Sequence, residues 1–155
     1  MEKTNAIRIL DKNKINYKTH SYVHTDAISG IEAAAALNQN PDHVFKTLVT
    51  TAKSRQHYVF MIPVAKELDL KKAAASVNEK SVEMLKLKDL FPLTGYVHGG
   101  CSPIGMKKVF TTVIDSSAQN YETIIFSAGK IGYQIETSLG GLQKIINIRL
   151  ADIII

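Results

Sequence analysis

The chain has 155 residues, of which 45% are hydrophobic and 21% charged, which is typical of one globular domain with its own core. The net charge of +5 is compatible with a polyanionic partner but does not require one. A single cysteine excludes an internal disulfide and favours a cytoplasmic setting, and the absence of a signal segment or of an apolar run near ~18 residues indicates no membrane association.

Hydrophobic periodicity and turn residues predict the secondary structure in chain order. Thr4 is expected to cap a first helix that ends in the polar stretch 11–16, and Ser29 a second helix that runs to Leu37. The other predicted elements are strands over 15–22, 44–52, 57–64, 109–114, 123–127 and 131–137, helices over 68–77, 81–90 and 138–148, a hairpin turn at 53–56, a helix break at 91–95, a turn or cap at 115–117 and a packed C-terminal end at 153–155. Hairpins mixed with helices predict a single α+β domain over 1–155, built on a mixed sheet rather than a Rossmann-type fold.

Lys46 interrupts the run 44–49, which otherwise predicts a buried strand. Burial disfavours the charged form of a lysine, so Lys46 either points outward from a sheet edge or faces an anion. In the second case it could hold a phosphate, polarise a carbonyl or act as a nucleophilic amine.

Two glycine-rich turns follow, at 98–105 and 127–132. Such turns can direct several backbone N–H groups at one phosphate or at a developing oxyanion. The first is not a Walker loop, because Gly105 precedes Met106 rather than the required lysine. The alternative is that the glycines only supply positive φ angles in tight connections.

Other chemistry-bearing residues give weaker patterns. Cys101 is a possible nucleophile or a small residue that fills its turn. No histidine forms a recognisable sequence motif with it that would mark a catalytic base. His20 and His24 resemble a metal pair only on a helix, and their stretch reads as extended, so no metal and no cofactor are predicted. Tyr22 could stack on a base or bond a ribose, or could belong to the rim of the core.

Several motifs together carry a resemblance that covers nearly the whole chain. They lie, in this order, at 13–17, 40–48, 68–73, 94–96, 99–108 and 127–130. The pairing of Val44-Phe45-Lys46-Thr47 with the Gly-Gly-Cys-Ser-Pro-Ile-Gly turn is the specific part. The chain resembles the YbaK/EbsC family of aminoacyl-tRNA deacylases, relatives of the editing domain inserted in bacterial prolyl-tRNA synthetases.

The resemblance implies a mostly antiparallel, partly closed barrel with flanking helices and places functional residues on this chain. The key lysine falls on Lys46, the tyrosine on Tyr22 and the substrate-loop glycine on Gly99, so Lys46 and Gly99 are the expected catalytic positions. The family commonly has an acid two positions before Glu136, where this chain has the neutral Gln134, and it tolerates apolar residues at position 101, which argues against a cysteine nucleophile. The expected substrate-binding residues are Tyr22, Phe45, Thr47, Gly95, Gly100, Ser102, Pro103, Ser127, Gly129 and Gln134.

The resemblance also implies a reaction, namely hydrolysis of the ester that joins an amino acid to the 3′-terminal adenosine of tRNA. The YbaK type is associated with Cys-tRNA(Pro), whose own thiol can attack the ester carbonyl, so a protein nucleophile is not needed. Two alternatives stay open: a deacylase of Ala-tRNA(Pro), and a catalytically silent module that binds tRNA or a nucleotide, which Gln134 favours. Also open are a requirement for prolyl-tRNA synthetase as a partner and the oligomeric state.

Overall fold

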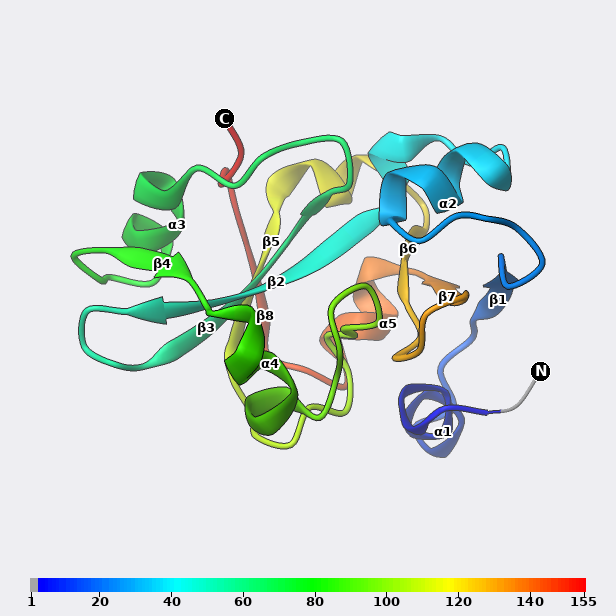
Figure 1. Cartoon of the computed structure of the whole chain (residues 1–155), viewed down its shortest axis with the longest axis horizontal. Helices are drawn as coiled ribbons and strands as arrows, with labels where there is room; N and C mark the ends of the chain where they lie inside the picture. The colour runs from blue at the N-terminus through cyan, green and yellow to red at the C-terminus, as the bar shows by residue number, and fades with distance from the viewer. Residues whose placement is uncertain (1–2) are drawn as a thin grey trace.

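The computed structural model describes residues 3–155, which form two β-sheets with helices packed around them (Figure 1). The helices are α1 (Asn5–Lys12), α2 (Gly30–Ala36), α3 (Leu70–Ser76), α4 (Leu87–Thr94) and α5 (Leu139–Gln143), with 3-10 turns η1 (Pro41–His43) and η2 (Ser116–Asn120). The strands are β1 (Lys18–Ser21), β2 (Phe45–Ala52), β3 (His57–Pro63), β4 (Val82–Met84), β5 (Thr111–Asp115), β6 (Ile124–Ser127), β7 (Tyr133–Thr137) and β8 (Ile148–Ala151).

The larger sheet has the strand order β4-β2-β3-β5-β8 and the smaller one the order β1-β7-β6. Four strand pairs are antiparallel and two are parallel, so the predicted α+β class with a mixed, mostly antiparallel sheet is confirmed. A single bridge between Val44 and Ile125 links the sheets. Among residues 3–155 no closed barrel forms, because β4 and β8 stay at opposite edges of the larger sheet, and the expected partial closure stays a prediction.

The main core lies between the two sheets and α1. Phe45 and Met61 from the larger sheet pack with Phe126 and Ile135 from the smaller one, and Leu10 closes the cluster from α1. Each of these side chains is at most 2% exposed, and burial of one is worth about 1.5–3 kcal/mol. This shared core fixes the start of β2 against β6, where the candidate site lies.

Three predicted stretches differ from the structure. The helix expected over 81–90 is instead β4 followed by α4, because Val82 and Glu83 pair with the edge of β2. The helix α4 then continues through Pro92, which lacks an N–H to donate to the preceding turn, and ends at Gly95 with φ of 85°. The helix expected over 138–148 stops at Gln143, and the unpredicted β8 pairs in parallel with β5.

The C-terminal end of the chain is packed at Ile153 but not at its last residue. Ile153 is fully buried, as the expected packing of the C-terminal end requires, whereas Ile155 is 77% exposed, so the expectation is wrong for that residue. Within the described part of the chain, no helix is long and apolar enough to cross a membrane. Figure 1 places α3 and α4 on opposite sides of the larger sheet and α2 beside the start of β2.

Candidate functional site

A cavity of about 740 Å³ lies along β2. One wall comes from residues 28–33 at the start of α2, and the opposite wall from residues 84–90 around the start of α4. The turn at 98–101 and the smaller sheet close the remaining sides. Of the predicted site residues, the cavity brings together Tyr22, Phe45, Lys46, Thr47, Gly99, Ser127 and Gln134.

The floor of the cavity includes an uncovered edge of β2. The edge strand β4 pairs with β2 only at Thr50, Thr51 and Ala52. Val44 and Ala52 form backbone hydrogen bonds with residues on the β3 side. Residues along a strand direct their N–H and C=O alternately to its two sides. Those of Thr47, three residues after Val44, therefore point toward the open edge. The hydroxyl of Thr47 is also buried without a partner among residues 3–155. Thr47 therefore presents two backbone polar groups at the open edge, while its hydroxyl is buried beneath the surface.

Lys46 lies on β2 opposite Ile62 and is partly buried. No hydrogen bond or ion pair joins its ammonium group to any residue among 3–155. Among the described residues that line the cavity, it is the only lysine or arginine, and Glu32 is the only carboxylate. No ion pair among the described residues joins Lys46 to Glu32, so its ammonium group is available to an anionic ligand.

Tyr22 and Gln134 meet the cavity from the smaller sheet. The Tyr22 N–H donates to the carbonyl of Gly132 at 2.8 Å, which fixes the residue beside the second glycine turn. Gln134 on β7 is 4% exposed, and its side-chain amide pairs with that of Gln39. The neutral side chain at position 134 is therefore held by a neutral neighbour.

The two glycine turns pack against each other. A Cβ added to Gly100 would lie 3.1 Å from the backbone nitrogen of Ile131, so only a glycine fits this contact without displacement. Gly99, with φ of 87°, is exposed at the cavity, and a Cβ there would lie 3.5 Å from the Ile28 carbonyl. Gly99 thus combines a left-handed backbone with an open approach to the ligand space.

Five predicted binding residues do not line the cavity: Gly95, Gly100, Ser102, Pro103 and Gly129. Gly95 caps α4, and the buried Ser102 hydroxyl accepts a hydrogen bond from the Ile104 N–H at 3.3 Å. Gly129 lies where a Cβ would come 2.9 Å from the Tyr96 ring. In the structure Gly95 ends α4 and the other four belong to the two turns, so any binding by these residues would be indirect.

Cys101 lines the cavity but is 8% exposed. Burial raises the pKa of its thiol to about 12, so the thiol is protonated at neutral pH. The adjacent Tyr96 has a pKa of about 12, also because of burial, and its hydroxyl donates to the Ile104 carbonyl at 2.5 Å. Neither group is in the ionised form that a nucleophile or general base requires.

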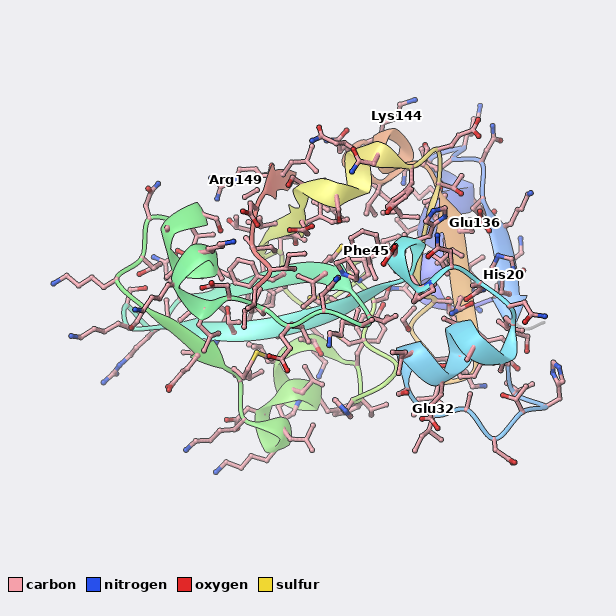
Figure 2. All side chains as sticks on the ribbon, turned by 90° about the horizontal axis from the view of Figure 1, so that it is seen from above. His20, Glu32, Phe45, Glu136, Lys144 and Arg149 are labelled. Atoms are coloured by element: carbon pink, nitrogen blue, oxygen red, sulfur yellow. The ribbon has the colours of Figure 1, made fainter. Side chains whose placement is uncertain are left out.

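A hydrogen-bonded pair of side chains joins β1 and β7 of the smaller sheet. Glu136 on β7 accepts from His20 on β1 at 2.7 Å and from Thr123 at 2.5 Å, and Figure 2 labels both members of the pair. Burial raises the pKa of Glu136, but the hydrogen bonds from Thr123 and His20 outweigh it and hold the pKa below its ordinary range. Among residues 3–155, no three His, Cys, Asp or Glu side chains gather at one point that could bind a metal.

The sequence reasoning missed the apolar rim of the cavity. Ile28, Ile31 and Leu87 line it and are 71%, 48% and 67% exposed. Large apolar side chains left in water at the mouth of a cavity mark a binding surface. The Ser29–Glu32 capping box, a sequence signal, does locate the start of α2 and with it Ile28 and Ile31. No comparable signal marks Leu87, because its stretch reads as a helix over 81–90.

Comparisons with known proteins identify the family of the chain. The family model described as "Aminoacyl-tRNA editing domain" matches residues 24–145. A protein of Enterococcus faecalis (strain ATCC 700802 / V583) named "Putative Cys-tRNA(Pro)/Cys-tRNA(Cys) deacylase EbsC" is 44% identical over 153 residues, which cover 98% of this chain and 93% of the relative.

Solved structures share the fold. The structure titled "Crystal structure of a putative trans-editing enzyme for prolyl tRNA synthetase" is 19% identical, with a TM-score of 0.83 over 99% of both chains. A hypothetical protein is 20% identical, with a TM-score of 0.86 over 96% of this chain and 97% of its own. The match of the family model over most of the chain and the EbsC relative together show that the chain belongs to the aminoacyl-tRNA editing domain family.

Proposed function

We propose that the protein is a trans-editing deacylase that removes cysteine from mischarged tRNA, with Cys-tRNA(Pro) as its main substrate. Family membership and the 44% identity to EbsC support the reaction class. The observation that carries the proposal is Lys46, an unpaired cation beside an uncovered strand edge in a cavity of about 740 Å³. A tRNA 3′ end offers the groups that such a cavity would bind: phosphate, ribose, a base and an aminoacyl ester.

The cavity suggests a role for each side of the substrate. Lys46 would bind a phosphate or polarise the ester, and the apolar rim around Ile28 and Leu87 would take the terminal adenine. The free backbone N–H and C=O of Thr47 would bond the ribose or the aminoacyl group. The backbone of the turn at Gly99 would donate to the oxyanion that develops at the ester carbonyl.

The substrate supplies its own nucleophile in this scheme. The cysteine thiol attacks its ester carbonyl, a C–S bond forms, the C–O bond to the ribose breaks, and the thiol proton passes to the ribose oxygen. A thiol distinguishes cysteine chemically, whereas one methylene of pocket size is worth only ~1–3 kcal/mol. The protonated Cys101, with a thiol pKa of about 12, fits a site without a protein nucleophile.

The test is a panel of aminoacylated tRNAs, with loss of the ester followed over time. We expect Cys-tRNA to be deacylated faster than Ala-tRNA, because a methyl group cannot attack an ester. Equal or reversed rates would favour the Ala-tRNA(Pro) alternative, and binding without any turnover would favour the silent module. We further propose a cytoplasmic location and prolyl-tRNA synthetase as the partner that produces the substrate, which co-purification of the two proteins with tRNA(Pro) would test.

A further inference from the structure

We propose that the base-paired stem of the RNA substrate lies over the α4 wall of the cavity, along four lysines, and is kept off the α2 wall. The four residues, here named the lysine ridge, are Lys86, Lys88, Lys107 and Lys108. This inference rests on the proposed function, since it places the body of the proposed substrate outside the cavity. It assigns an interaction surface to residues that do not line the cavity.

The lysine ridge follows α4 from end to end. Lys86 is the N-cap residue of α4, and Lys88 lies in its first turn. At the other end, the Lys107 N–H donates to the Thr94 carbonyl at 3.0 Å, and the Lys107 ammonium lies 5.3 Å from the centre of the Phe91 ring. All four lysines are exposed. A helix of 8 residues spans about 12 Å, so the ridge offers charges to several phosphates in a row.

The ridge borders the mouth of the cavity because the same helix lines it. Leu87 and Leu90 of α4 line the main cavity. The acids of this wall, Glu83 and Asp89, line a second cavity of about 380 Å³ together with Lys86, and none of the three lines the main one. If the 3′ end of an RNA enters the main cavity, the part of the RNA just outside it would therefore lie beside the lysine ridge.

The opposite wall repels phosphate. No lysine or arginine occurs between Thr19 and Phe45, whereas this stretch contains Asp26, Glu32 and Asp42. Glu32 lines the main cavity, and Figure 2 labels it on α2. Figures 1 and 2 place α2 and α4 in front of β2 and apart from each other, so the two walls carry opposite charge across one opening. Phosphates are drawn to the α4 side and pushed from the α2 side.

Two quadruple variants test the proposal. The ridge variant carries Lys86→Gln, Lys88→Gln, Lys107→Gln and Lys108→Gln. The control variant carries Lys53→Gln, Lys66→Gln, Lys71→Gln and Lys80→Gln, which remove the same charge from exposed positions that neither line the cavity nor belong to α4. The Kd of each variant for tRNA without an attached amino acid is measured across salt concentrations. Turnover is measured with intact Cys-tRNA and with a cysteinyl ester of adenosine alone.

We expect the ridge variant to weaken tRNA binding about tenfold or more at low salt. The slope of log K against log salt concentration should become less steep by ~0.9 for each phosphate that the protein no longer neutralises. The control should change binding far less, and both variants should cleave the adenosine ester as the wild type does. Equal losses of tRNA affinity in both variants, or loss of the short ester by the ridge variant, would overturn the proposal. Wild-type protein that cleaves neither ester would refute the proposed function. In that case the Kd values of the ridge and control variants would still show whether the lysine ridge binds tRNA. Lys88→Gln and Lys108→Gln alone, each with a ~threefold loss, provide the same test if the quadruple variant does not fold.

Discussion

The side-chain amides of Gln39 and Gln134 exchange two hydrogen bonds, of 2.8 Å and 3.3 Å, across the wall of the cavity. A primary amide has two N–H donors and two acceptor positions, so each side chain keeps one of each for other partners. Gln134 therefore reaches the cavity with a fixed orientation and with both donor and acceptor capacity. The family's common acid would offer acceptors only.

The first prediction concerns this pair. Gln39→Met should destabilise the fold by about 1–3 kcal/mol, because it leaves the buried Gln134 amide without its partner. The variant Gln134→Met should cost a similar amount, and the double variant less than the sum. Urea unfolding of the three variants measures this coupling, and strictly additive costs would show that the pair contributes nothing.

The second prediction concerns Lys46. Lys46→Ala should lower kcat/KM by roughly ten- to a hundredfold, because a charge-assisted contact is typically worth about 1.5–3 kcal/mol. The melting temperature should change little, since no hydrogen bond or ion pair among residues 3–155 holds the ammonium. Lys53→Ala, at an exposed turn, is the matched control. Wild-type activity in Lys46→Ala would show that Lys46 has no catalytic role and is only a solvated lysine at a strand edge.

The third prediction concerns Cys101. Cys101→Ala should keep most of the activity, and iodoacetamide at neutral pH should inhibit the wild type little, because burial raises the thiol pKa to about 12. Steady-state rates before and after alkylation give the answer. Complete loss of activity in a variant with normal circular dichroism would instead assign Cys101 a nucleophilic role.

The fourth prediction concerns Gly99. An alanine there must adopt φ of 87°, which costs about 1–2 kcal/mol, but its Cβ would make only ordinary contacts, the nearest at 3.5 Å. The single-turnover rate should fall by more than this stability loss explains, because Gly99 lines the cavity and its backbone is proposed to donate to the developing oxyanion. Gly95→Ala, with φ of 85°, reports the stability cost of a positive φ alone. A folded Gly99→Ala protein with an unchanged rate would remove this turn from the catalytic assignment.

The fifth prediction concerns pH. The pKa of Glu136 is lower in the folded state than in the unfolded state, where it is about 4.3, so its stabilisation is complete above that value. The contribution is lost as the pH falls through the lower, folded value. Glu136→Gln should therefore flatten the fall of the melting temperature as the pH drops below about 4.3, with exposed Glu122→Gln as control. Parallel curves for the wild type and Glu136→Gln would contradict this.

The sequence predicted the parts of the site that depend on local patterns. The paired runs that form β2 and β3 are long and apolar, so the position of Lys46 within a strand follows directly from them. The glycine turns are evident from composition, and their contact at Gly100 and Ile131 agrees with two turns acting together.

The rest depends on contacts between distant residues. The three-residue strand β4 is too short for a periodic signal, and it forms because the edge of β2 is available to Val82 and Glu83. The short β8 likewise depends on β5. The α4 wall follows from the placement of β4, so neither Leu87 in the rim nor the lysine ridge can be located without the sheet.

The uncovered edge of β2 also bears on self-association. Unpaired N–H and C=O groups along a strand are a template for pairing with a strand of another molecule, which leads to aggregation. Here the free stretch around Thr47 borders a cavity walled by α2 and α4, and β4 covers Thr50, Thr51 and Ala52 further along the strand. A flat strand from a second molecule would meet these walls before it could pair along the free stretch. The walls of the candidate site thus oppose polymerisation through the exposed backbone groups of Thr47.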